Sequence, residues 1–375
     1  MTRKPRARAI DLMLQRIRQT AADPSPAFPH YGDPQTGAWT RSENGDWTGG
    51  FWVGELWLAA AATGDDQLRA RASEWSERIL PRASSDTIFR GFLFWYGAAI
   101  GARLFDDDAA AAIAETGAAG LLQMYDEKAG LLPLGTTAEE AQSVGHFDTN
   151  IDGVPGVVPL LAWTGRRSGA TARIDMARSH ARQHEAFCVR DDDSVCQSAS
   201  FDPADGSLVR RYTHKGVTDE STWTRAQAWA MLGYAQSVHW LGKEFLDVAC
   251  RVADWWIAHL PDDDITWWDF DAPGTIRDTS GTAIAAAAML KLAAAPGVED
   301  DRYRAAAERM IDALIDRHLT GMNPGDLRPP GILADGCYNQ RIELATANEL
   351  IWGDYMLLEA LLCIEDRTPI RSEEL

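Results

Sequence analysis

Apolar residues gather into six segments that are apolar on nearly every face. Each segment follows a polar or aromatic lead-in and continues for the length of a helix, with small residues interspersed. A helix without a polar face is buried, because a surface helix needs one side that contacts water. The six segments begin at Trp47, Arg90, Ile151, Trp223, Arg277 and Asn348.

A second kind of segment lies before the first of these six and between each pair of neighbours. Its charged residues lie on one face and its apolar residues on the other, which is typical of helices that cover a core. Six such segments begin at Pro5, Asp65, Asp106, Thr171, Gly242 and Asp301. Six inner helices alternating with six outer ones predict an all-α (α/α)6 toroid, in which every inner helix begins at the same mouth.

The helical pattern is interrupted between residues 194 and 212. Runs from Ser194 to Phe201 and from Ser207 to Tyr212 flank the turn sequence DPADG, which predicts a short β-hairpin on the rim. No linker rich in Gly, Ser or Pro divides the chain. We therefore expect residues 1–375 to form a single catalytic domain.

Charge and composition narrow the choice of partners. The formal net charge of -19 repels polyanions, so nucleic acid is not expected as a ligand. The basic N-terminus lacks an apolar signal region and no long apolar run follows, which predicts a cytoplasmic protein that does not enter a membrane. The 15 tryptophans suggest that some indoles line a sugar-binding surface. The pattern predicts no particular oligomeric state.

The sequence gives no sign of a metal site. The 5 cysteines and 8 histidines show none of the spacings of zinc ligands, and the acidic triplets do not fit a calcium-binding loop. We expect no metal and no cofactor, and we expect the cysteines to be reduced.

Polar residues at the six helix starts should meet at the mouth of the toroid. Asp152 precedes Gly153, and a carboxyl group that enters a pocket of Trp and Val should have its pKa raised by desolvation, as suits a general acid. Asp148, four residues earlier, could bond the lead-in loop or raise the pKa of Asp152 further. Either aspartate could instead be a helix N-cap, which contributes about 1 kcal/mol.

Residues 213–229, THKGVTDESTWTRAQAW, supply complementary groups. Arg225 and Gln227 at a helix entrance could hold a carboxylate or hydroxyls in fixed geometry, and His214 and Lys215 add donors. Arg225 could equally pair with a neighbouring acid, Asp219 or Glu220. Further candidates at the helix starts are Trp47, Arg90, His146, Trp229 and Trp352.

Several stretches, in order along nearly the whole chain, resemble the unsaturated glucuronyl hydrolases of glycoside hydrolase family 88. A weaker likeness is to the unsaturated rhamnogalacturonyl hydrolases of family 105. The matching stretches include DWTGGFWVGELWLAAAATGDDQ, RGFLFWYGAAIG, IDGVPGVVPLLAW and SFDPADGSLVRRYTHKGVTDESTWTRAQAWAMLGYA. The resemblance implies an (α/α)6 barrel without metal or organic cofactor.

The resemblance also implies a reaction. The substrate would be a small oligosaccharide whose nonreducing end carries the unsaturated uronic acid left by a polysaccharide lyase. An aspartate protonates C4 of the C4=C5 vinyl ether, water adds at C5, and the adjoining sugar is released. That aspartate corresponds to Asp152. Arg225, His214 and Lys215 would neutralise the uronate, while Trp47, Trp229 and Trp352 would stack on sugar rings.

Three positions depart from the family pattern. The segment His-Asp-x-Gly-Phe reads IFRGF here, so the position of the family's other acid falls on Phe89, and Asp86 could substitute only if the loop is rearranged. A family histidine falls on Gln197, and the Asp of WTDGFW falls on Gly49. The alternatives are therefore a hydrolase of saturated glucuronides, a glucuronate lyase, and an inactive sugar-binding protein.

Overall fold

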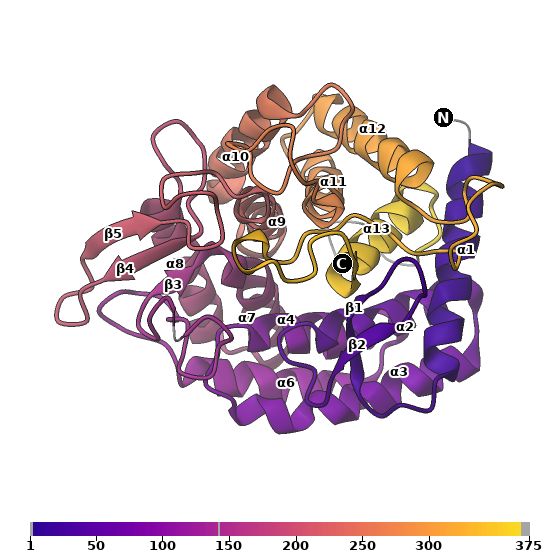
Figure 1. Ribbon diagram of the computed structural model, residues 1–375. Coiled ribbons are helices and arrows are strands. Elements are labelled where there is room, and N and C mark those ends of the chain that lie inside the picture. Colours follow the sequence, from indigo (N-terminus) through magenta and orange to yellow (C-terminus); the bar gives the residue numbers. More distant parts are fainter. Residues whose placement is uncertain (1–2, 142, 369–375) are drawn as a thin grey trace.

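The computed structural model describes residues 3–141 and 143–368, which form a ring of helices (Figure 1). The inner helices are α2 (Gly49–Thr63), α4 (Arg90–Phe94) continued by the π-helix η2 (Trp95–Ala99) and α5 (Ile100–Phe105), α7 (Val154–Ser168), α9 (Thr224–Leu241), α11 (Thr279–Ala293) and α13 (Ile351–Ile364). The outer helices are α1 (Arg3–Ala22), α3 (Asp66–Ile79), α6 (Asp108–Leu122), α8 (Thr171–Cys188), α10 (Leu246–His259) and α12 (Arg302–Arg317). This alternation confirms the predicted (α/α)6 fold.

Burial separates the two kinds of helix as their residue patterns predict. Every residue of α11 from Thr279 to Leu292 is buried. The outer helix α3 buries one stripe only and leaves its charged face in solvent. The inner helices therefore hold the core, and the outer helices shield it from water.

Glycines allow the inner helices that carry the site to approach closely. A Cβ atom on Gly91 of α4 would lie 2.7 Å from the backbone carbon of Gly156 in α7, and a Cβ on Gly156 would lie 2.5 Å from the nitrogen of Phe92. Both distances are shorter than real Cβ contacts, so only glycine fits here. This contact holds the start of α7 against α4.

Two small antiparallel sheets lie at the same end of the ring as the helix starts. One has the order β3-β4-β5, formed by Thr149–Asn150, Ser198–Phe201 and Leu208–Tyr212, with Ser198 paired to Tyr212 and Thr149 to Ala199. Its β4–β5 pair confirms the predicted hairpin. The other sheet, β2-β1-β6, joins Trp39–Ser42, Phe28–Gly32 and Glu349–Leu350 and was not predicted.

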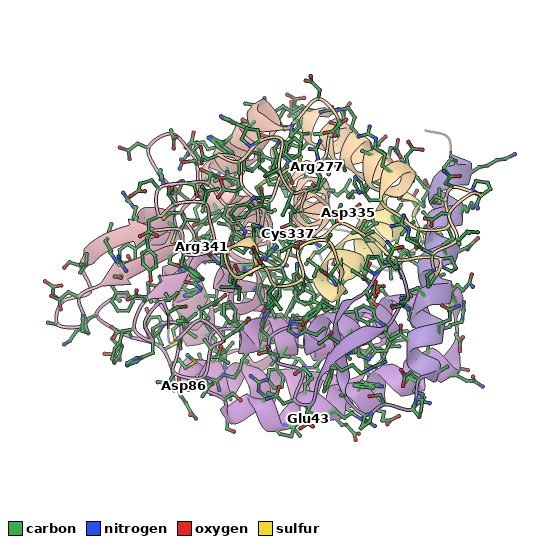
Figure 2. All side chains as sticks on the ribbon, in the orientation of Figure 1. Glu43, Asp86, Arg277, Asp335, Cys337 and Arg341 are labelled. Carbon is green, nitrogen blue, oxygen red and sulfur yellow. The ribbon has the colours of Figure 1, made fainter. Side chains whose placement is uncertain are left out.

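Long loops precede the inner helices and converge over the ring. The segment between α12 and α13 crosses in front of the ring in Figure 1, and Figure 2 places Cys337 of this segment near the middle and Asp86 toward the lower edge. Across the described residues, no helix combines the length and apolar character needed to cross a membrane.

Candidate active site

A small cavity lies where the inner helices begin. Its lining comes from residues at the starts of α2, α4, α7 and α9 together with two loops. The nine lining residues are Trp47, Phe89, Phe92, Glu140, Asp152, Lys215, Trp223, Arg225 and Trp229. Five candidates from the sequence, Trp47, Asp152, Lys215, Arg225 and Trp229, are thus brought together.

Asp152 lies in the short 3-10 helix η3 (Ile151–Gly153), which connects β3 to α7. The preceding chain is fixed by the pairing of β3 with β4, and the Ile151 amide donates to the Gln197 carbonyl at 3.0 Å. The Asp152 side chain caps no helix: Oδ2 accepts a 2.9 Å bond from Nε2 of Gln197, and Oδ1 has no hydrogen-bond partner among the described residues. The N-cap interpretation is therefore wrong for this residue.

Electrostatics prepare Asp152 for proton transfer. The pKa of its carboxyl group is raised from 3.8 to about 7, mainly by burial and also by the negative charge of Glu140, against the opposing effects of Lys215, Gln197 and Arg225. A carboxyl group with such a pKa is partly protonated near neutral pH, as an effective general acid should be. The free Oδ1 atom belongs to a side chain that lines the cavity.

Gln197 connects Asp152 to the next loop. Its Nε2 donates to Asp152, while its Oε1 accepts a 3.1 Å bond from the backbone nitrogen of Lys215. These two bonds fix which end of the amide faces the carboxyl group. Gln197 is fully buried and lies behind the cavity lining, so it acts through Asp152.

Glu140 is a buried cavity residue that the sequence pattern did not reveal. Its carboxylate forms an ion pair with Nζ of Lys215 and accepts a 3.3 Å bond from Nδ2 of Asn150. Burial opposes ionisation of Glu140, but Lys215 and His214 outweigh it and lower the pKa of the carboxyl group to about 2. Glu140 is therefore ionised beside Asp152.

Arg225 has partners other than those expected from its sequence neighbours. Its guanidinium pairs with Asp278 at 2.7 Å and donates to the backbone carbonyls of Cys337 and Tyr338. The pairing with Asp219 or Glu220 is thus wrong. Asp278 also caps α11 through bonds from the amides of Ser280 and Gly281, so Arg225 connects α9 to α11 and to the crossing loop.

Aromatic rings form the apolar wall of the cavity. Phe89 and Phe92 stack in parallel with centroids 6.1 Å apart, and Phe92 contacts Trp229 at 4.9 Å. Trp47 is oriented by its Nε1, which donates to Glu139 at 3.0 Å and to the Tyr338 hydroxyl at 3.2 Å.

Trp352 lies outside the cavity lining, contrary to its expected stacking on a sugar. It packs against Trp47 at 4.7 Å and donates from Nε1 to Ser280 Oγ at 3.1 Å. Trp352 therefore supports the indole of Trp47 from behind.

The structure does not bring the other two candidate acids to the cavity. Asp86 is exposed, and its carboxylate accepts bonds from the amide and hydroxyl of Thr136 at 2.9 and 2.6 Å. Asp148 accepts bonds from Ser200 and Tyr212 at 2.7 and 2.5 Å, so it braces the β4–β5 hairpin. The rearranged loop that would let Asp86 replace the missing acid is absent from this part of the structure.

The remaining candidates also have structural partners outside the lining. His146 is exposed and packs its ring on Phe147, while buried Arg90 donates to the carbonyls of Ala83 and Thr87. Gln227 also lies outside the cavity lining, and its side-chain amide donates to the backbone carbonyls of Asp193 and Val252.

His214 likewise lies outside the cavity lining. Its Nδ1 lies 2.9 Å from Ser198 Oγ, and its Nε2 lies 3.8 Å from Glu140. No group of three or more His, Cys, Asp or Glu side chains within residues 3–141 and 143–368 could hold a metal ion.

Comparisons with known proteins agree with the architecture. No protein-family model matches the chain. The sequence is 34% identical over 349 residues to the unsaturated glucuronyl hydrolase of Bacillus sp. (strain GL1), covering 90% of this chain and 91% of that protein. It is 29% identical over 369 residues to the unsaturated chondroitin disaccharide hydrolase of Streptococcus pyogenes serotype M1, covering 94% and 90%.

A solved structure gives the same result in three dimensions. An aspartate-to-asparagine variant of an unsaturated glucuronyl hydrolase, described with dGlcA-Glc-Rha-Glc, matches with a TM-score of 0.88 and 31% identity. The match covers 95% of this chain and 96% of that one. This chain therefore belongs to the unsaturated glucuronyl hydrolases and is a glycoside hydrolase.

Proposed function

We propose that this protein removes an unsaturated 4-deoxy-4,5-ene uronyl residue from the nonreducing end of short oligosaccharides, with Asp152 as general acid and base. The observation that carries this proposal is the unpartnered Oδ1 of Asp152, on a carboxyl group with a pKa of about 7 in a buried aromatic cavity. The relatives support the substrate class, because their names state unsaturated glucuronyl and chondroitin disaccharide substrates.

The reaction begins with transfer of the Asp152 proton to C4 of the vinyl ether. The π electrons form the new C4–H bond, and the positive charge that develops at C5 is shared with the ring oxygen. The oxygen of a water molecule then bonds to C5, and its proton passes to the Asp152 carboxylate, which restores the acid. The resulting hemiketal opens and releases the adjoining sugar.

Two cations at the cavity favour a uronate over a neutral sugar. Lys215 and Arg225 both line the cavity, and each has a carboxylate partner, Glu140 and Asp278 respectively. A third carboxylate can approach such a cluster because the guanidinium and ammonium groups offer several donors each. Trp47 and Trp229 supply apolar faces for the sugar ring.

Ultraviolet absorbance tests the reaction. With an unsaturated disaccharide, the enzyme should destroy the conjugated uronate and its absorbance should fall as free sugar appears. A lyase would create this absorbance from a saturated uronide, and a hydrolase of saturated glucuronides would leave it unchanged. A sugar-binding protein would bind and form no product. The cytoplasmic location expected from the sequence stays a prediction.

A further inference from the structure

The cavity contains a second carboxyl group at a position that the sequence did not suggest. Phe89, where the family's other acid would lie, is part of the aromatic wall and stacks on Phe92. Among the nine lining residues, the carboxyl groups belong to Asp152 and Glu140. Glu140 comes from the loop between α6 and β3, whereas Asp152 lies at the start of α7.

Glu140 is held firmly although it lies in a loop. It is 7% exposed, its carboxylate is paired to Lys215, and Asn150 of β3 donates to its Oε2. The adjacent Glu139 accepts bonds from Trp47 and Tyr338, which fixes the loop to the opposite wall. Glu140 therefore has a defined position in the cavity.

The Glu140–Lys215 pair is coupled to Asp152 by geometry. Nζ of Lys215 lies 5.8 Å from the ring centroid of Trp223, which lines the cavity, and 5.3 Å from that of Tyr338. The backbone nitrogen of the same lysine donates to Gln197, whose other end donates to Asp152. Lys215 thus contacts Glu140 through its side chain and contacts Gln197, the partner of Asp152, through its backbone.

We propose that Glu140 is a positioning residue of the reaction, whose charge keeps Asp152 protonated for transfer to C4. This inference rests on the proposed function. Glu140 has Lys215 and Asn150 as its partners and does not contact Asp152, so it acts on Asp152 through its charge.

The charged groups around Asp152 define the expected effect. Glu140 raises the pKa of Asp152, whereas Lys215 and Arg225 lower it. The neighbouring Cys188 is neutral, because its hydrogen bond with Cys196 and its burial raise the pKa of its thiol well above the usual range. Nε2 of His214 lies 3.8 Å from Glu140, and burial lowers the pKa of the His214 imidazole. Removal of the Glu140 charge leaves two cations and no anion at the cavity beside Asp152, so the pKa of Asp152 should fall.

The test is the pH dependence of kcat/KM for Glu140→Gln, since this profile reports ionisations of the free enzyme. The alkaline limb of this profile should move to lower pH by about one unit, which is the usual effect of one nearby charge on a pKa. Activity should then fall about 10-fold at pH 8 and change little at pH 5, because one pH unit changes the protonated fraction tenfold only above the pKa.

Three further variants separate charge from structure. Glu140→Asp keeps the charge and should keep the limb near its wild-type position. Glu140→Met removes the charge without an amide group and should move the limb to lower pH, as Glu140→Gln does. Glu139→Gln makes the same charge change on the same loop but outside the cavity lining, and it should shift the limb less than Glu140→Gln does.

The assay distinguishes failure of the proposed function from failure of the role proposed for Glu140. If wild type does not consume an unsaturated uronide, the proposed function fails. If wild type is active but Glu140→Gln loses activity equally at pH 5 and pH 8, Glu140 is only structural and this inference is wrong. If Glu140→Gln does not fold by circular dichroism, the pH profile of Glu140→Met decides, and an alkaline limb that stays at its wild-type position overturns the proposal.

Discussion

Replacement of Asp152 by Asn should remove most of the activity and at the same time stabilise the fold at alkaline pH. Burial raises the pKa of Asp152 from 3.8 to about 7 in the folded protein. An acid whose pKa is higher when folded binds more protons in that state, so stability is lost as pH rises from about 4 to about 7. The loss amounts to at most about 4 kcal/mol at pH 8, at about 1.4 kcal/mol per pKa unit.

Asn removes this penalty with little change in shape. Its side-chain oxygen can accept the bond that Gln197 donates to Oδ2, and its amide nitrogen takes the place of the unpartnered Oδ1. The free energy of unfolding should therefore rise by about 1–4 kcal/mol at pH 8 and by much less at pH 4. Activity should fall roughly 10²–10⁴-fold, the usual contribution of general acid catalysis.

Urea unfolding at pH 8 and pH 4, combined with the ultraviolet assay, measures both effects. Asp148→Asn is the matched control, since it makes the same change four residues earlier. Asp148 accepts bonds from Ser200 and Tyr212, so its loss should destabilise the protein by about 1–2 kcal/mol and preserve most of the activity. Equal destabilisation by Asp152→Asn at both pH values, or activity within about threefold of wild type, would contradict the role given to this carboxyl group.

Two other substitutions test the surroundings of the site. Arg225→Lys loses the planar guanidinium group that bonds Asp278 and two backbone carbonyls at once. The value of kcat/KM should therefore fall about 10-fold or more, and the melting temperature should drop. An unchanged kcat/KM would contradict a role of Arg225 in the site. Glu55 is buried next to Asp354 and Glu349, and burial raises the pKa of its carboxyl group well above the usual range. Wild type should therefore lose thermal stability between pH 5 and pH 8, and Glu55→Gln should reduce this loss. An equal loss of melting temperature in the two proteins over this pH range would contradict the prediction.

The helices were predictable because their burial is uniform along each segment. In α11 nearly every residue is buried and apolar or small, and in α3 the charged residues keep to one face, so the two patterns differ clearly. The β2-β1-β6 sheet gives no such signal. Strand β1 contains Pro29 and has no regular alternation, and β6 has two residues, so the pairing is set by contacts between distant parts of the chain.

The site was predictable where its residues begin inner helices. Asp152, Trp47 and Arg225 were found because the fold brings all such starts to one mouth. Glu140 escaped notice because it lies in a loop with the polar composition of a surface segment, and its burial depends on Lys215 from a distant loop. Asp148 gave a false signal, because its hairpin partners Ser200 and Tyr212 are also distant in the sequence.

Proton delivery to C4 is measured most directly by running the reaction on an unsaturated disaccharide in deuterium oxide and recording the product by NMR within the first turnovers. With Asp152 as the donor on one face of the ring, one deuterium should appear at C4 in a single stereochemical configuration, and Asp152→Asn should form no labelled product at a comparable rate. Product that lacks deuterium at C4, or that carries it in both configurations from the outset, would contradict protonation by Asp152.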